Sequence, residues 1–214
     1  MNVKNNLSKK PIPVVFGVKG FKLNKKEKKF FEESNPLGFI LFERNCKTYN
    51  QTKLLIKELK KITSHKHTII MIDQEGGRVA RLKKPYWNAY PSAEYFGIKA
   101  EKNLAIGKKL VLKNSMAIAS ELKKLGINMN CAPVLDVKYN FTNNIIGDRS
   151  FSSNPKIVSA LGKSFCNGHK KIGIIPIIKH IPGHGSSSKD SHPRHCLEAY
   201  GLLKQPLRRG AWYF

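Results

Sequence analysis

The sequence predicts an α/β fold in which helices cover a parallel β-sheet, and two observations lead to this class. Short apolar segments typical of strands alternate along the chain with longer amphipathic segments typical of helices. The strand segments are apolar on both faces, which is characteristic of parallel sheets that lie between helices. With 214 residues and a hydrophobic content of 41%, the chain is large enough for one such domain.

Five apolar segments are expected to form the strands. Each is rich in Ile, Val, Leu or Phe, and polar or turn-forming residues follow it. The segments are residues 12–18, 38–42, 68–72, a strand within 127–137 that ends near Asp136, and 174–178.

Four amphipathic segments are expected to form helices, at residues 25–33, 51–62, 102–125 and 155–171. Asn24 and Glu27 have the spacing of a capping box at the start of the first helix. Gly126 is placed to cap the C-terminus of the longest helix. Pro155 occupies the first position of the last helix, where a missing N–H is tolerated.

Residues 85–97 (PYWNAYPSAEYFG) are expected to form an aromatic loop between the third strand and the longest helix. This loop either packs over the rim of the sheet or forms a wall for a flat ligand such as a sugar. The sequence leaves both interpretations open.

Polar motifs recur where the predicted strands end: ERN after the second, DQEGGR after the third, LDV in the fourth and KHIPGHG after the fifth. In a (β/α)8 barrel the C-terminal ends of all strands share one rim, so these motifs would converge there. A doubly wound open sheet is the competing fold. The GxGxxG motif typical of its dinucleotide-binding form does not follow the first strand, which favours the barrel.

The composition is strongly basic, with 39 Lys+Arg against 14 Asp+Glu and a formal net charge of +25. Such a charge suggests a nucleic-acid partner, but the lysines are spread over predicted helix surfaces and no DNA- or RNA-binding signature is present. We therefore expect no nucleic-acid partner. No apolar run is long enough to span a bilayer, so we also expect no membrane partner and a cytoplasmic location.

Four motifs occur in the order and spacing of one known family. They are IDQEGGRVARL at residues 72–82, SELKKLGINMNCAPVLDV at 120–137, GDRSF at 147–151, and KHIPGHG followed by DSH at 179–192. Together they resemble the bacterial β-N-acetylglucosaminidases, or β-hexosaminidases, of glycoside hydrolase family 3, of the cytoplasmic type that recycles peptidoglycan. The resemblance extends over residues 11–192.

The resemblance implies a TIM-type (β/α)8 barrel, incomplete here because about five β/α units are present. Residues 1–192 would form the N-terminal part of this barrel. The implied activity is that of a retaining glycosidase that removes terminal β-linked N-acetylglucosamine from muropeptide fragments. The implied partner is therefore a small carbohydrate, and the resemblance implies neither a metal nor another cofactor.

The resemblance also assigns roles to particular residues. The positions that would hold the sugar hydroxyls are Asp73, Arg81, Arg149, Lys179 and His180. A carboxylate beside cationic donors suits this role, because a sugar hydroxyl both donates and accepts hydrogen bonds. His192, oriented by Asp190, matches the general acid/base. An aspartate that accepts the ring N–H of a histidine fixes its tautomer and stabilises the imidazolium.

Two further features are interpreted as structural. His180 and His184 have an HxxxH spacing, but the Pro and Gly between them disfavour a helix, so we expect no metal site. Glu75 is a candidate catalytic carboxylate. We expect it instead to satisfy backbone donors at the turn formed by Gly76 and Gly77.

The sequence departs from the family's pattern after the DSH motif. The family's nucleophile is an Asp on a later strand, and these residues contain no match for it, so we assign no nucleophile. Residues 1–192 contain 31 Lys and 4 Arg, whereas residues 193–214 contain 1 Lys and 3 Arg. We interpret 193–214 as an aberrant tail, produced by a frameshift or an artificial junction.

A polypeptide of these residues is therefore expected to be weakly active or inactive. One alternative is a non-catalytic remnant that binds amino sugars. Another is a β-N-acetylglucosaminide phosphorylase, because a histidine acid/base is never negatively charged and lets phosphate approach in place of water. Most glycosidases use a carboxylic acid at this position.

Overall fold

The computed structural model describes residues 10–181 and 183–188, so the predicted tail at 193–214 lies outside the described residues. The strands are β1 (Ile12–Gly17), β2 (Pro36–Leu41), β3 (Ile69–Ile72), β4 (Gln74–Gly76), β5 (Val79–Ala80), β6 (Met129–Asn130) and β7 (Ile175–Pro176). The α-helices are α1 (Lys25–Ser34), α2 (Tyr49–Ile62), α3 (Ala93–Lys102), α4 (Leu104–Leu125) and α5 (Pro155–Ile172). Short 3-10 helices are η1 (Glu43–Asn45), η2 (Gly147–Arg149) and η3 (His184–Ser186).

Five strands form one sheet in the order β1-β2-β3-β6-β7, and every neighbouring pair is parallel. Gly38 of β2 pairs with Ile69 of β3, and Met129 of β6 pairs with Ile175 of β7. Apart from the small antiparallel β4–β5 hairpin, each strand lies beside the one before it, without the reversal of order that a doubly wound sheet requires. This is the strand order of a TIM-type barrel, and the predicted α/β class is confirmed.

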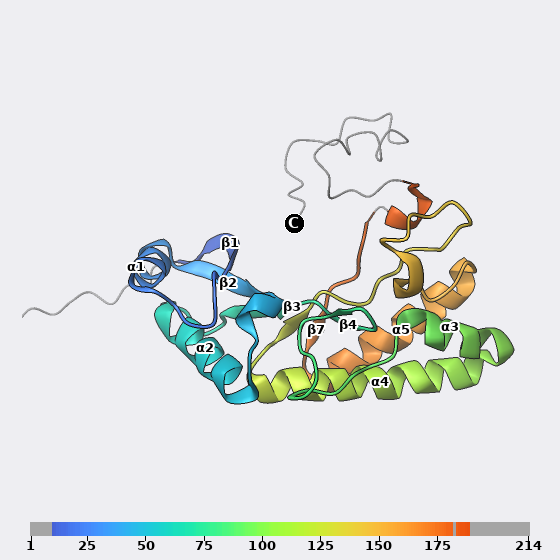
Figure 1. Cartoon of the computed structure of the whole chain (residues 1–214), viewed down its shortest axis with the longest axis horizontal. Helices are drawn as coiled ribbons and strands as arrows, with labels where there is room; N and C mark the ends of the chain where they lie inside the picture. Colours follow the sequence, from blue (N-terminus) through green and yellow to red (C-terminus); the bar gives the residue numbers. More distant parts are fainter. Residues whose placement is uncertain (1–9, 182, 189–214) are drawn as a thin grey trace, which may run out of the picture.

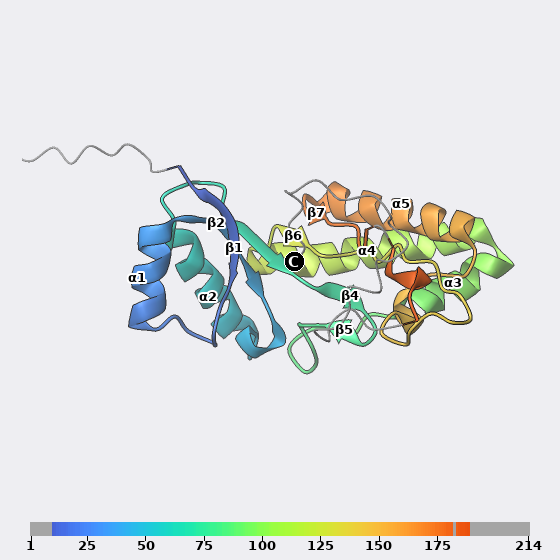
Figure 2. The same cartoon turned by 90° about the horizontal axis from the view of Figure 1, so that it is seen from above.

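The helices lie along the sheet in chain order (Figures 1 and 2). Helices α1 and α2 lie beside β1 and β2, and α4 and α5 run along one another next to β6 and β7. Helix α3 packs against both α4 and α5 and also contacts η2, which belongs to the long connection after β6. None of the helices in the described part of the chain is long and apolar enough to cross a membrane.

Helix ends follow the sequence predictions. The Asn24 side chain accepts a hydrogen bond from the Glu27 N–H at 2.9 Å, and the Glu27 carboxylate accepts one from the Asn24 N–H at 3.1 Å, which completes the capping box. Gly126 caps α4 in the left-handed conformation, with φ of 94°. Pro155 begins α5, and Asn154 caps it by accepting from the Lys156 N–H.

The helix predicted at 102–125 is confirmed as α4, which begins two residues later, but the separate helix α3 that ends directly before it was not predicted. Asn103 ends α3, where its N–H donates to the Lys99 carbonyl, and its side chain then accepts from the Ile106 N–H to cap α4. An Asn side chain competes with the helical hydrogen bonds in this way, which explains the break. The predicted aromatic loop at 85–97 is correspondingly shorter, since α3 begins at Ala93.

The later strands are shorter than predicted. β6 and β7 each contain two residues, and proline residues account for their shortness. Pro133 and Pro176 lack the N–H that a strand interior donates to its neighbour. Pairing nevertheless resumes further along, where Val134 bridges Lys179 in parallel. This bridge carries Lys179 to the end of the sheet where the polar motifs gather.

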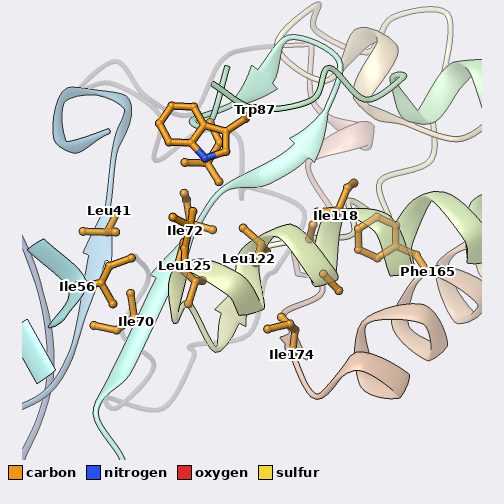
Figure 3. Packing of buried hydrophobic residues seen from close by; sticks show 14 of the residues in the cluster. Leu41, Ile56, Ile70, Ile72, Trp87, Ile118, Leu122, Leu125, Phe165 and Ile174 are labelled. Carbon is orange, nitrogen blue, oxygen red and sulfur yellow. The ribbon is translucent and has the colours of Figure 1, made fainter. Parts of the chain in front are cut away.

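One continuous core joins the sheet to α2, α4 and α5 (Figure 3). Leu122 and Leu125 of α4 lie close to Ile70 and Ile72 of β3, and none of the four is more than 2% exposed. Full burial of such side chains stabilises the fold by about 1.5–3 kcal/mol each. This core fixes the strand ends that carry the polar residues.

Helix α3 touches the loop after η2 so closely that Gly97 has no room for a side chain. A Cβ at this position would lie 1.5 Å from the carbonyl oxygen of Phe151. We expect Gly97→Ala to lower the free energy of unfolding by about 1–3 kcal/mol, measured by urea denaturation. Gly20→Ala is the control, since nothing lies within 4 Å of its added Cβ. Equal stability of the two variants would contradict this packing.

His169 of α5 is fully buried, and burial lowers the pKa of its ring from 6.5 to about 4. Its Nδ1 lies 2.7 Å from the Ser115 hydroxyl, and its Nε2 lies 2.9 Å from the Asn130 amide nitrogen. The ring is therefore neutral near pH 7 in the folded chain, and it protonates only in acid.

The lowered pKa of His169 makes folding pH-dependent. Between pH 6.5 and about 4 the unfolded chain binds a proton that the folded chain does not. This contribution is fully present above pH 6.5, and we expect up to about 3 kcal/mol of it to be lost as the pH falls through the window. Urea denaturation of wild type and of His169→Gln, which has no ionisable ring, measures it. Identical pH profiles in this window would contradict the prediction.

Candidate active site

Charged side chains gather beyond the C-terminal ends of β3, β6 and β7. Asp73 follows β3 directly, and Glu75 lies in β4. Lys179 and His180 follow β7, while η2 supplies Arg149 from the connection after β6. In a parallel sheet these strand ends lie at the same edge, so residues far apart in the sequence converge there.

Asp73 is held by two cations. Its carboxylate oxygens lie 2.8 Å from Lys179 Nζ and 3.1 Å from Arg81 Nη2, and its side chain is 16% exposed. Burial alone would raise the pKa of this carboxyl, but the charges and hydrogen bonds of Lys179 and Arg81 outweigh burial and hold the pKa below its ordinary value. Asp73 is thus an ionised acceptor with a fixed orientation.

Glu75 makes the most buried ion pairs of the cluster. Its carboxylate receives two hydrogen bonds from Arg149, both at 2.9 Å, and lies 2.5 Å from Lys179 Nζ. Burial would lower the pKa of Arg149, but the hydrogen bonds and charge of Glu75 raise it above the ordinary value. The expectation that Glu75 satisfies backbone donors at the glycine turn is therefore wrong: the Gly77 N–H donates to the Tyr90 carbonyl instead.

Asp136 orients His180. Its fully buried carboxylate lies 2.6 Å from His180 Nδ1 and also accepts from the backbone N–H groups of His184 and Gly185. Burial would raise the pKa of Asp136, but the hydrogen bond and charge of His180 and the backbone donors together hold it below the ordinary value. Its position near the end of the fourth predicted strand, in the LDV motif, was the signal for this residue, although the motif alone did not assign it a role.

All five predicted sugar-holding residues are brought together. Asp73 contacts Arg81 and Lys179, and Arg149 contacts both Glu75 and, at 3.4 Å, the Nε2 of His180. The cluster thus contains three carboxylates, including Glu75 and Asp136, and three permanent cations, so these charges balance. Because each is partnered, the side chains are held in place before a ligand arrives. A neutral polyhydroxyl ligand, which needs both donors and acceptors, suits such a site better than a charged one.

The two predicted catalytic residues, Asp190 and His192, lie outside the described residues. The segment that leads toward them is anchored within the described part: η3 donates to Asp136, and Asn143 Nδ2 donates to the Ser188 carbonyl. His180 and His184 lie side by side, with ring centroids 5.9 Å apart. Among residues 10–181 and 183–188, no group of three or more His, Cys, Asp or Glu side chains is placed to hold a metal ion.

The ERN motif after β2 has a structural role. Asn45 is fully buried and donates to the carbonyls of Val18 and Gly20, and Arg44 donates to the Val18 carbonyl. These bonds tie the connection after β1 to the end of β2. The motif follows a strand as the other polar motifs do, but its contacts do not involve the charged cluster.

A small cavity lies behind Glu75 and Arg149, lined mainly by apolar residues such as Phe96, Val111 and Phe165. Its volume of about 20 Å³ is enough for one water molecule and far too small for a sugar ring. Within the cluster itself, the side chains of Arg81 and His180 remain accessible to solvent, at 28% and 34% exposed.

A charged cluster at the C-terminal ends of sequentially ordered parallel strands defines the ligand-binding rim of an α/β-barrel protein. The profile of the Glycosyl hydrolase family 3 N terminal domain matches residues 9–200. The chain belongs to this family, and the resemblance expected from its four motifs is confirmed.

Similar proteins agree with this assignment. A β-hexosaminidase of Psychromonas ingrahamii is 36% identical over 181 residues, which cover 84% of this chain and 52% of the relative. One of Thioalkalivibrio sulfidiphilus is 32% identical over 180 residues, 84% of this chain and 51% of the relative.

Solved structures are similar as well. Native NagZ from Neisseria gonorrhoeae matches with a TM-score of 0.80 and 32% identity, over 85% of this chain and 52% of that chain. The same protein in complex with N-trifluoroacetyl-D-glucosamine matches with a TM-score of 0.78 and 32% identity, over 82% and 52% of the respective chains. The chain thus spans about half the length of the relatives that it matches.

Proposed function

We propose that this chain binds the terminal β-linked N-acetylglucosamine of a peptidoglycan fragment at the cluster formed by Asp73, Arg81, Arg149, Lys179 and His180. The observation that carries the proposal is the interlocked arrangement of Asp73 with Lys179 and Arg81. A carboxylate fixed between two cations offers an acceptor and several donors within one small area. Adjacent hydroxyls of a pyranose ring require this combination.

The comparisons support the class of ligand. Relatives that match 84% of this chain are named β-hexosaminidases, and one NagZ structure contains an N-acylated glucosamine. The muropeptide origin of the sugar and the cytoplasmic location belong to our proposal and rest on the resemblance to the peptidoglycan-recycling type.

We further propose that His192, oriented by Asp190, is the general acid/base of a retaining glycosidase reaction. An imidazole in this role donates a proton to the leaving oxygen and later accepts one from water. Retention also needs a nucleophilic carboxylate on the other side of the sugar. No residue of this sequence is assigned that role, so a polypeptide of these 214 residues should bind the sugar with little or no turnover.

The test uses this polypeptide in two assays. Saturable binding of N-acetylglucosamine, followed by ligand-observed NMR, is expected for wild type and for His192→Ala alike. Absence of saturable binding to folded wild type would end the proposed function. Incubation with an aryl β-N-acetylglucosaminide should release almost no phenol, with or without inorganic phosphate. Turnover that His192→Ala abolishes would refute the predicted inactivity, and turnover that requires phosphate would identify a phosphorylase.

A further inference from the structure

A series of buried, hydrogen-bonded polar side chains lies behind the charged cluster. It extends from α4 and α5 through β6 to the β4–β5 hairpin. Its members are Ser115, His169, Asn130 and Gln74, and none is more than 1% exposed. A buried polar group destabilises a protein unless it is hydrogen-bonded, so such a series persists only when every member has its partners.

In this series the donor and acceptor of each hydrogen bond can be assigned in only one consistent way. The Ser115 hydroxyl donates to the Phe165 carbonyl at 2.5 Å, which leaves its oxygen to accept from His169 Nδ1 at 2.7 Å. His169 therefore carries its proton on Nδ1. Its bare Nε2 accepts from the Asn130 amide nitrogen at 2.9 Å. A neutral histidine can donate at one end and accept at the other in this way.

Asn130 connects His169 to the backbone of Gln74 through hydrogen bonds. Its amide nitrogen donates a second hydrogen bond to the Gln74 carbonyl, and its amide oxygen accepts from the Gln74 N–H, both at 2.9 Å. The amide orientation of Asn130 is thus dictated by Gln74 and His169 together. If His169 presented a proton on Nε2, it would oppose the Asn130 donor.

Gln74 in turn holds the hairpin. Its side-chain oxygen accepts from the N–H groups of Arg81 and Leu82, and its side-chain nitrogen donates to the Leu82 carbonyl. The segment from β4 to the end of the hairpin is therefore fixed through one buried side chain. Arg81, one of the residues proposed to meet the sugar, lies at its end.

Gln74 stands between the two carboxylates that bind Lys179. Successive side chains of an extended segment point to opposite faces, so the inward direction of Gln74 aims Asp73 and Glu75 outward. Both carboxylates reach Lys179 Nζ, at 2.8 Å and 2.5 Å. A rotation of the Gln74 peptide would displace both at once.

We propose that His169 is a positioning residue for amino-sugar binding, acting through Asn130 and Gln74 on Asp73 and Glu75. The identity of the ligand rests on the proposed function, whereas the hydrogen-bond series is independent of it. The close approach of α5 to α4 supports it: a Cβ on Gly168 would lie 2.4 Å from Ser115 Oγ. The two helices are thus near enough for Ser115 to set the orientation of the His169 ring.

The first test is made on wild type and does not depend on the stability of any variant. Long-range ¹⁵N–¹H NMR spectra distinguish the protonation states of an imidazole. At pH 7 we expect a neutral His169 ring with its proton on Nδ1. A proton on Nε2, or a charged ring, would overturn the proposal, because neither can accept from Asn130.

The second test uses two variants that each retain one end of the series. The shorter amide of His169→Asn can replace Nδ1 and donate to Ser115, but it loses the bond from Asn130. The longer amide of His169→Gln can replace Nε2 and accept from Asn130, but it loses the bond to Ser115. Each variant lacks one buried hydrogen bond, so a purely structural role predicts similar effects of both.

A positioning role predicts that the variants differ. Hydrogen exchange of the Gln74 backbone N–H should accelerate by about 10-fold or more in His169→Asn, with little change in His169→Gln. The affinity for N-acetylglucosamine should fall by about 10-fold in His169→Asn and by less than about 3-fold in His169→Gln. Equal losses in the two variants would overturn the inference. If wild type binds no sugar, the proposed function fails, while the exchange and tautomer results still decide whether His169 fixes Gln74.

Discussion

Arg149→Met is expected to lower the free energy of unfolding by about 3–5 kcal/mol. Arg149 and Glu75 form a two-bond ion pair whose side chains are 10% and 8% exposed. Removing the guanidinium leaves the buried Glu75 carboxylate with Lys179 as its remaining cation. A buried charge that loses a partner destabilises the fold far more than an exposed one, because water cannot replace that partner. Urea denaturation followed by circular dichroism measures the loss.

Lys138→Met is the matched control, because it removes one cation from an exposed pair. Lys138 and Glu94 lie 2.7 Å apart, but their side chains are 44% and 41% exposed. Exposed pairs contribute about 0–1 kcal/mol. If Arg149→Met destabilises the protein no more than Lys138→Met does, the Glu75–Arg149 pair is not the buried anchor that its geometry indicates.

Asp73→Asn is expected to weaken the binding of N-acetylglucosamine by about 100-fold. The amide has the shape of the carboxylate, so packing is retained. However, it cannot accept charge-assisted hydrogen bonds from sugar hydroxyls. It also removes the anion that orients Arg81 and one of the two anions that hold Lys179. Titration calorimetry with N-acetylglucosamine measures the affinity, and the melting temperature shows whether the variant is folded.

Glu43→Gln controls for the loss of one negative charge. Glu43 pairs with Lys83 at 2.7 Å, but both side chains are more than half exposed and lie outside the proposed sugar site. Its affinity for the sugar should match that of wild type. An Asp73→Asn protein that is folded and binds as tightly as Glu43→Gln would remove Asp73 from the proposed site.

The parts of the fold that depend on local interactions followed from the sequence. The capping box at Asn24 and Glu27 and the glycine cap at Gly126 involve residues no more than four positions apart, so their spacing alone predicted them. Helix α3 was missed because the aromatic residues of 85–97 were interpreted as a loop, although α3 begins at Ala93. The strands β6 and β7 were predicted too long, because the prediction followed the apolar residues and did not take into account that proline has no N–H to donate to a neighbouring strand.

For the candidate site, the sequence predicted some residues with their roles and missed the partners of others. The motifs identified Asp73, Arg149 and Lys179, and the chemistry of sugar recognition explained why a carboxylate and cations occur together. Glu75 was assigned the wrong partners and Asp136 no role, because their actual partners are distant in the sequence: Arg149 lies 74 residues from Glu75, and His180 lies 44 residues from Asp136. Such pairings become visible only when the strand ends are placed in space.

The order of the sheet has a consequence for biosynthesis. Each strand of β1-β2-β3-β6-β7 docks beside the one made before it. Translation proceeds from the N-terminus, so within the described sheet each strand after β1 is made when the neighbour that precedes it already exists. The growing protein can thus add one strand and its helix at a time, with the carboxylates of the Asp73 segment in place before Lys179 is translated.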